Sequence, residues 1–199
     1  MSLTAVPPGE IATIVTSLQM LERPKPRPMP SSNLRLDRWR EPSPDRYRAL
    51  FRRVGEPWLW FSRLVMDEAR LIAIIHDPAV EIYAVTDARG IELGLLELDF
   101  REAGQAELSF FGLVPELTGQ GEGRWLMGHA LALCWRKGID RVWVHTCTLD
   151  HPKALGFYRA QGFVPYGRAV ETFPDPRVIG VLPAEAAPHV PLLSASSRR

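Results

Sequence analysis

A glycine-rich turn in the second half of the chain has the residue types and spacing of an anion-binding site. The apolar stretch from Glu107 to Val114 is typical of a buried strand, and Pro115 ends it. Glycine then occupies every second position from Gly119 to Gly123. Without side chains in the way, the backbone N–H groups of such a turn can point at one phosphate, and a following helix adds partial positive charge at its N-terminus. The turn therefore predicts a site for phosphate or pyrophosphate.

The residues after the turn show helical periodicity. The stretch from Arg124 to Lys137 is expected to form a helix that Gly138 ends. The phosphate loop of nucleoside triphosphatases needs Gly-Lys followed by Ser or Thr, and a dinucleotide-binding turn needs G-x-G-x-x-G. Neither matches the G-x-G-x-G spacing found here. Taken alone, the turn is equally consistent with a tight strand-to-helix connection that binds nothing.

Two motifs that follow one another along the chain resemble those of the GNAT superfamily, the Gcn5-related N-acetyltransferases. The first motif of that family is Arg or Gln, two residues, Gly, one residue, then Gly or Ala, and Thr118 to Gly123 occupy its place. The second is Ala-x-x-x-Tyr-x-x-x-Gly-Phe, which Ala154, Tyr158, Gly162 and Phe163 fill. Together the motifs cover under a third of the chain. The resemblance implies a GNAT fold and the transfer of an acetyl group from acetyl-CoA to an amine.

Three positions depart from the family pattern. Thr118 stands where the family has Arg or Gln, Glu122 replaces an aliphatic residue, and His151 replaces a helix-start asparagine that often touches the cofactor. The family binds phosphate mainly through backbone N–H groups, so Thr118 need not abolish binding. Glu122, in contrast, places a negative charge near a polyanion. Replacing it with leucine should tighten cofactor binding if that charge is harmful.

The resemblance also assigns the cofactor contacts. In the family, the pantetheine arm lies between the two central strands where they splay apart, and these strands correspond to residues 107–114 and 141–146. Backbone groups of the first strand would face the arm, and the glycine turn would hold the pyrophosphate. The residues expected to contact acetyl-CoA are Leu113, Val114, Gly119, Gln120, Gly121, Glu122, Gly123, Arg124 and His151.

Attack on a thioester requires a neutral amine, whereas an alkyl amine is mostly protonated at neutral pH, so a base should accept its proton. Glu107 is the candidate, because it stands where several GNAT enzymes carry a glutamate base. The competing interpretation is a strand-end charge that faces solvent. His145, at the end of the neighbouring strand, is the second candidate for the base.

The departing thiolate needs a proton or a hydrogen-bond donor. The resemblance assigns this role to Tyr158, since the family uses the tyrosine of the second motif as the acid. The alternative is a core tyrosine on the helix face that Ala154 shares. Nearby, His145, Cys147, Asp150 and His151 invite a metal-site interpretation. Asp150 is better explained as a helix N-cap, and no metal is predicted.

Two functional classes follow from these residues. The first is an acetyl-CoA-dependent N-acetyltransferase that acts by direct attack on an amine of a small molecule or a protein. The second is a degenerate domain that binds acyl-CoA or a protein partner without catalysis, and Thr118 and Glu122 are its main support. The aromatic stretch from Trp58 to Phe61 fits either a packed core or the wall of a substrate pocket.

Composition narrows the class of protein further. Twenty-four Lys and Arg residues nearly balance 23 Asp and Glu, so neither nucleic acid nor an anionic membrane is expected as a partner. Two cysteines do not make a disulfide framework. No signal-peptide pattern or apolar run near twenty residues is present, which favours a cytoplasmic protein. We expect a monomer or homodimer with one domain over residues 1–182.

The periodicity predicts an α+β fold with a mixed, mostly antiparallel sheet of six to seven strands and about four helices. Helices are expected over residues 44–54 and 67–75, and a first strand over 11–21. Strands over residues 81–86 and 91–100 lead by short turns into the central strand, which makes these three antiparallel. A last strand is expected over 168–173. Residues 23–33 form a proline-rich arm, and residues 183–199 are expected to be a poorly ordered tail.

Overall fold

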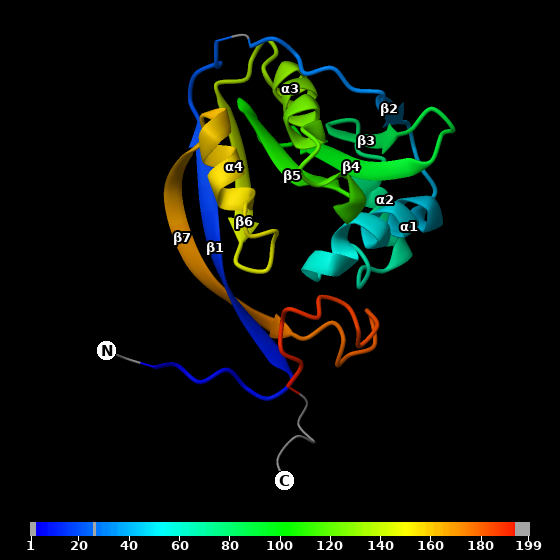
Figure 1. Cartoon of the computed structure of the whole chain (residues 1–199), viewed down its shortest axis with the longest axis vertical. Helices are drawn as coiled ribbons and strands as arrows, with labels where there is room; N and C mark the ends of the chain where they lie inside the picture. The colour runs from blue at the N-terminus through cyan, green and yellow to red at the C-terminus, as the bar shows by residue number, and fades with distance from the viewer. Residues whose placement is uncertain (1–2, 26, 194–199) are drawn as a thin grey trace.

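A computed structural model describes residues 3–25 and 27–193, and within them seven strands form one sheet that four α-helices cover (Figure 1). The strand order is β2-β3-β4-β5-β6-β1-β7. The strands are β1 (Glu10–Met20), β2 (Arg35–Trp39), β3 (Val80–Thr86), β4 (Glu92–Asp99), β5 (Gln105–Leu113), β6 (Arg141–Cys147) and β7 (Val164–Pro174). The helices are α1 (Pro44–Gly55), α2 (Glu68–Ile75), α3 (Glu122–Cys134) and α4 (Ala154–Gln161). The α+β fold is the one predicted from the sequence.

Neighbouring strands are antiparallel except for β5 and β6, which are parallel. The meander β3-β4-β5 is therefore confirmed, as is the helical crossover through α3 that joins the parallel pair. The N-terminal strand β1 lies between β6 and β7 and pairs antiparallel with both. Figure 1 shows β1 and β7 as long neighbouring strands along one side of the molecule. The sequence predicted the strand β1 but not its place in the sheet.

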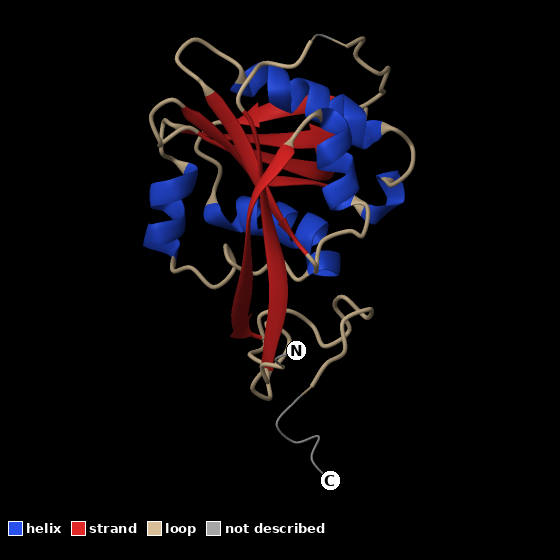
Figure 2. Ribbon diagram, turned by 90° about the vertical axis from the view of Figure 1, so that its left-hand side faces the viewer, coloured by secondary structure: helices blue, strands red, loops and turns tan. Residues whose placement is uncertain are grey.

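The helices cover both faces of the sheet (Figure 2). Side chains alternate along a strand, so Tyr83 and Val85 of β3 face one core while Ile82 and Ala84 face the other. The first core includes buried residues of α3 and α4, and the second includes those of α1 and α2. Alternate residues of a strand therefore pack against different helices, one set against α3 and α4 and the other against α1 and α2.

Local signals start both helices on the α1/α2 face. The Ser43 side chain accepts a hydrogen bond from the amide of Arg46, and Pro44 occupies the first turn of α1. Asp67 caps α2 by accepting from the amide of Arg70 at 2.8 Å. The capping chemistry thus fixes where the two helices on this face of the sheet begin.

Two predicted boundaries are wrong. Helix α3 begins at Glu122 and ends at Cys134, not at Lys137, and Gly138 lies in the following turn with φ of 90°. Strand β7 begins at Val164, four residues before the predicted start. Pairing with β1 explains the longer strand, because Gln19 of β1 is the partner of Val164. The local sequence gives no sign of that partner.

The proline-rich arm runs from the end of β1 to the start of β2 and passes over α3 (Figure 1). Met29 packs on Gly128 of α3, where an added Cβ would lie 2.6 Å from the Met29 sulfur. Ser32 donates a 2.6 Å hydrogen bond to the Glu122 carboxylate at the start of the same helix. The arm is thus attached to the helix that follows the glycine turn.

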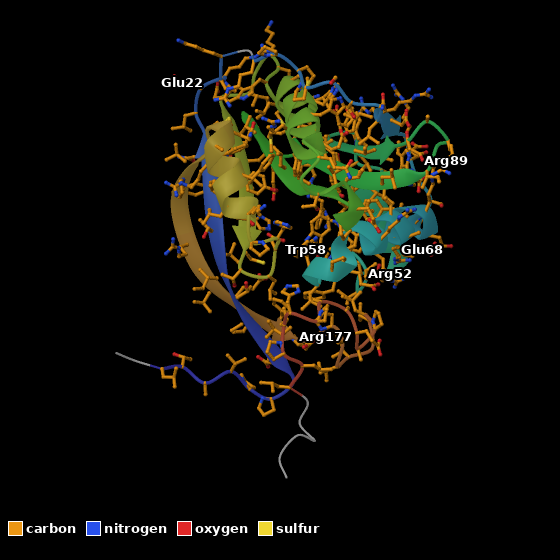
Figure 3. The ribbon with its side chains drawn as sticks, viewed as in Figure 1. Glu22, Arg52, Trp58, Glu68, Arg89 and Arg177 are labelled. Carbon is orange, nitrogen blue, oxygen red and sulfur yellow. The ribbon has the colours of Figure 1, made fainter. Side chains whose placement is uncertain are left out.

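The segment after β7 is held by a buried arginine (Figure 3). Arg177 pairs with Asp175 at 2.7 Å and also donates to the backbone carbonyls of Ala186, Ala187 and Val190. The predicted loose tail covered residues 183–199. In the structure, residues 183–193 carry Ala186 and Ala187 into a small core with Leu59, and residues 194–199 lie outside the described residues.

Replacing Arg177 with methionine is expected to lower the free energy of unfolding by about 3–5 kcal/mol, because the Asp175 carboxylate would stay buried without its partner. Urea unfolding measures the change. The control is Arg89→Met, which breaks an exposed pair with Asp87 and should cost far less, because solvent screens the pair. Equal losses in the two variants would contradict a structural role for Arg177.

Candidate active site

The candidate site is a cavity of about 850 Å³ at the point where β5 and β6 separate. The two strands pair over only three positions, ending with Glu107 opposite Trp143. Beyond that pair, the β5 edge that faces β6 has no partner strand among the described residues. Backbone N–H and C=O groups on this edge are therefore available to an extended ligand.

A bulge and the strand alternation decide which backbone groups face the cavity. Glu97 of β4 pairs with Phe110 and Leu98 pairs with Leu108, so Ser109 is an extra residue in β5. The amide of Val114 donates to the carbonyl of Leu93 at 2.9 Å, and Val114 does not line the cavity. Because hydrogen bonding alternates along a strand, Leu113 instead presents its backbone to the open edge.

The glycine turn forms one end of the cavity. Gly121, with φ of 89°, occupies the N-cap position of α3, and Gly119 also has a positive φ. Within the described residues, the amides of Gly119, Gly121, Glu122 and Gly123 have no hydrogen-bond acceptor. They lie where the helix dipole is positive. This end of the cavity is lined by Thr118, Gly119, Gly121, Gly123 and Arg124.

Two predicted contacts of the turn point elsewhere. The Gln120 side chain donates to the carbonyl of Glu116 at 2.7 Å, and Gln120 does not line the cavity. The Glu122 carboxylate accepts from Ser32 of the arm, so its charge is turned from the cavity toward the arm. The sequence could not reveal this, because Ser32 lies 90 residues away. His151 does line the cavity, on the turn before α4.

Glu107 lies at the last position where β5 pairs with β6, on the sheet face that α1 and α2 cover. Its neighbours Ala106 and Leu108 belong to the opposite core, which fixes the direction of the carboxyl group. Burial raises the pKa of Glu107 to about 7, and the carboxylates of Asp99 and Glu97 add to the rise. The His145 Nδ1 atom lies 3.6 Å from its Oε1 atom. A carboxyl group of this pKa can take up or release a proton near neutral pH.

A buried network supports this end of the cavity. Glu97 is fully buried and accepts hydrogen bonds from the Tyr47 hydroxyl and from Arg63, the latter at 2.5 Å. The Arg63 guanidinium also lies over the Phe110 ring, 5.1 Å from its centre. Sequence reasoning missed this network. Its one visible signal is a glutamate inside the apolar run of β4.

Tyr158 reaches the cavity from α4, on the opposite face of the sheet from Glu107. It is buried beside Phe111, with ring centres 6.1 Å apart, and beside Phe163. Burial raises the pKa of Tyr158 strongly, and the Asp150 carboxylate adds to the effect, so the phenol keeps its proton. Two groups from opposite faces can line one cavity only because β5 and β6 have parted between them.

The model of the acetyltransferase (GNAT) family matches residues 32–163, well over half of the chain. The chain belongs to the GNAT acetyltransferase family. The match contains the glycine turn, Glu107 and Tyr158 and ends at Phe163, so β1 and β7 lie outside it. The sequence finds no match among the curated proteins.

Solved structures share the GNAT fold at low sequence identity. A functionally unknown conserved protein from Staphylococcus epidermidis has a TM-score of 0.55 and 13% identity; the match covers 84% of this chain and 63% of that one. The aminoglycoside acetyltransferase meta-AAC0020 from an uncultured soil metagenomic sample, in complex with sisomicin, has a TM-score of 0.53 and 18% identity, covering 65% and 88%. A chimera of spermidine N-acetyltransferase SpeG from Vibrio cholerae with hSSAT has a TM-score of 0.53 and 24% identity, covering 68% and 83%.

The prediction that Asp150 is the N-cap of the helix after β6 is wrong. Asp150 does not cap α4, because the helix begins at Ala154 with Lys153 in the N-cap position. Instead its carboxylate accepts from Thr146 at 2.7 Å, from the Cys147 amide at 2.9 Å and from the Trp60 indole at 3.3 Å. Asp150 therefore ties the aromatic stretch after α1 to the end of β6.

Neither a metal cluster nor a membrane helix is found in the part of this GNAT chain that the structure describes. In residues 3–25 and 27–193, no three His, Cys, Asp or Glu side chains gather as metal ligands would. Over the same residues, no helix is long and apolar enough to span a bilayer.

Proposed function

We propose that this protein is an acetyl-CoA-dependent N-acetyltransferase that moves the acetyl group to an amine by direct attack. The observation that carries the proposal is one cavity lined by a proton-accepting carboxyl group, a protonated phenol and a glycine turn with unpaired amides. Similar structures named for aminoglycoside and spermidine acetylation support a small-molecule amine as the acceptor. The alternative of a domain that only binds is not favoured, because Glu107 and Tyr158 both line the cavity.

The cavity offers separate partners for the parts of acetyl-CoA. The amides of Gly119, Gly121 and Gly123 suit the pyrophosphate, since they have no acceptor within residues 3–25 and 27–193 and lie at a helix N-terminus. The open edge of β5 at Leu113 suits the strand-like pantetheine arm. The thioester would then reach the region between Glu107 and Tyr158, where the cavity passes from one sheet face to the other.

The two acid–base groups have complementary tasks in the proposed reaction. Glu107 takes a proton from the acceptor ammonium, directly or through water, and leaves a neutral amine. The amine nitrogen forms a bond to the acetyl carbonyl carbon as the carbon–sulfur bond breaks. Tyr158 donates its proton to the departing sulfur, and the second proton that the nitrogen loses passes through water to restore the phenol. The raised pKa of Tyr158 keeps that donor protonated before the reaction. His145, beside Glu107, stays as the second candidate for the base.

Release of free thiol from acetyl-CoA, measured with and without a mixture of primary amines, tests the proposal. Amine-dependent release is expected, with the acetylated amine as the second product. Release that does not depend on an amine would indicate hydrolysis, and the absence of release at saturating acetyl-CoA would contradict transfer.

Replacing Glu122 with glutamine is expected to tighten acetyl-CoA binding only about two- to fivefold. This range corresponds to a single charge near a helix N-terminus, and glutamine can still accept the Ser32 hydrogen bond. Calorimetric titration measures the dissociation constant. Ser32→Ala is the control, since it removes the contact and keeps the charge. Weaker binding by the glutamine variant would show that the carboxylate helps the site.

A further inference from the structure

Aromatic side chains form the wall of the cavity on the acceptor side of Glu107. They come from the stretch after α1, from β5 and from β7, and each is partly exposed within the cavity. The ring centres of Trp60 and Phe110 lie 5.2 Å apart, and those of Phe61 and Phe173 lie 4.9 Å apart. Figure 3 shows Trp58 between α1 and the turn before α4, where its ring meets His151. The wall consists of Trp58, Trp60, Phe61, Phe110 and Phe173.

The Trp60 ring is fixed in place by its surroundings. A Cβ added to Gly55 would lie 2.3 Å from the Trp60 Cβ, and one added to Gly112 would lie 3.0 Å from the ring. Glycine at these two positions therefore makes the space in which the indole lies. The indole N–H donates to Asp150, which holds the ring from the other side. An aromatic surface held in this way is available to a ligand without the entropy cost of ordering it.

The charges around the wall suit a ligand with one positive group. Two arginines of the cavity are already paired, Arg101 with Asp99 and Arg63 with Glu97, whereas Arg124 lies at the glycine-turn end. Glu171 lines the cavity and has no ion-pair partner within residues 3–25 and 27–193. The His145 Nδ1 atom lies 3.6 Å from Glu107, and the charges of Asp99, Glu97, Arg63 and Arg101 also act on this carboxyl group. Glu107 and Glu171 can therefore each meet one positive group near the aromatic side chains.

We propose that the acceptor is a primary amine that carries a flat aromatic group, an arylalkylamine, and that this group lies against the aromatic wall. The inference rests on the proposed acetyltransferase function and names its substrate class. Aromatic rings prefer stacked or edge-to-face contact with other rings, which five ring side chains from three segments can supply. A polyamine or an aminoglycoside would have to bring several charges out of water against these rings. Of the carboxylates that line the cavity, Asp99 is paired with Arg101, and Asp150 already accepts from Thr146, Cys147 and Trp60, which leaves Glu107 and Glu171.

Acetyl transfer to a panel of amines tests the substrate class. Tryptamine and phenethylamine are compared with spermidine and kanamycin by thiol release, and acetyl-CoA binding is measured separately by calorimetry. We expect kcat/KM for the arylalkylamines to be at least about tenfold higher than for the polycations. Preference for spermidine or kanamycin, or no acetylated arylalkylamine although acetyl-CoA binds, overturns the inference. Failure to bind acetyl-CoA overturns the proposed function together with it.

Variants of the wall provide an independent test. Phe173→Leu is expected to raise the KM for tryptamine about tenfold and to leave the acetyl-CoA dissociation constant unchanged. Phe61→Leu should act in the same direction, because the two rings are paired. The matched control is Tyr166→Leu on the same strand, since Tyr166 is exposed and does not line the cavity. Equal KM values in all three variants overturn the proposed placement.

Discussion

Replacing Tyr158 with phenylalanine is expected to lower kcat for acetyl transfer by about 10²–10⁴-fold, the range found for positioned acid–base groups. The ring would keep its packing against Phe111 and Phe163, because only the hydroxyl is lost. The sulfur would then leave without a donor. The dissociation constant of acetyl-CoA should change little, since the phosphate and pantetheine contacts lie elsewhere in the cavity. Steady-state kinetics and calorimetry on the same preparation separate the two effects.

The Tyr158 prediction has a matched control on β7. Tyr166→Phe removes the same hydroxyl from an exposed residue outside the cavity and should leave both parameters unchanged. An unchanged rate in Tyr158→Phe would remove the proposed role and leave a core tyrosine. A loss of acetyl-CoA binding would indicate a role in holding the cofactor instead.

Replacing Glu107 with glutamine is expected to lower kcat/KM by about 10²–10⁴-fold and to abolish its dependence on a group of pKa about 7. In the unmodified protein the base must be ionised, so kcat/KM should rise tenfold per pH unit below pH 7 and level off above it. The pH profile therefore distinguishes a base from a residue that only shapes the cavity.

His145→Gln is the comparison for this profile, because His145 is the neighbouring candidate for the base. If Glu107→Gln keeps the rising limb and His145→Gln loses it, the assignment of Glu107 is wrong. The stability of the fold provides a second measure. The pKa of Glu107 is about 7 in the folded state and 4.5 for an ordinary glutamate, so the folded state binds this proton more tightly than the unfolded state does. Stability should fall as pH rises from about 4.5 to about 7, and Glu107→Gln should remove that fall.

Features that depend on short stretches of sequence were predicted correctly. The glycine turn needs positive φ at Gly119 and Gly121, which glycine alone adopts easily, so the turn is visible in the sequence. Helix α1 has its cap, its first-turn proline and its apolar face within twelve residues. The β3-β4-β5 meander follows from short turns between apolar runs.

Features that depend on distant partners were not predicted. The place of β1 between β6 and β7 is set by pairing across more than a hundred residues. Arg177 holds the segment after β7 because the fold brings Asp175 and several backbone carbonyls around its guanidinium group. The capping residue assigned to α4, Asp150, instead bonds Trp60 from 90 residues away. A single sequence carries no local sign of such partners.

Calorimetric titration with acetyl-CoA, with free CoA in parallel, tests the central claim most directly. The glycine-turn amides, which have no acceptor in the part of the chain that the structure describes, and the open edge of β5 predict micromolar binding of both compounds, despite Thr118 and Glu122. Similar affinities for the two are expected, because most of the contacts would come from the CoA part. No binding at millimolar concentrations would contradict the proposed cofactor site, since the cavity would then be present without binding acetyl-CoA.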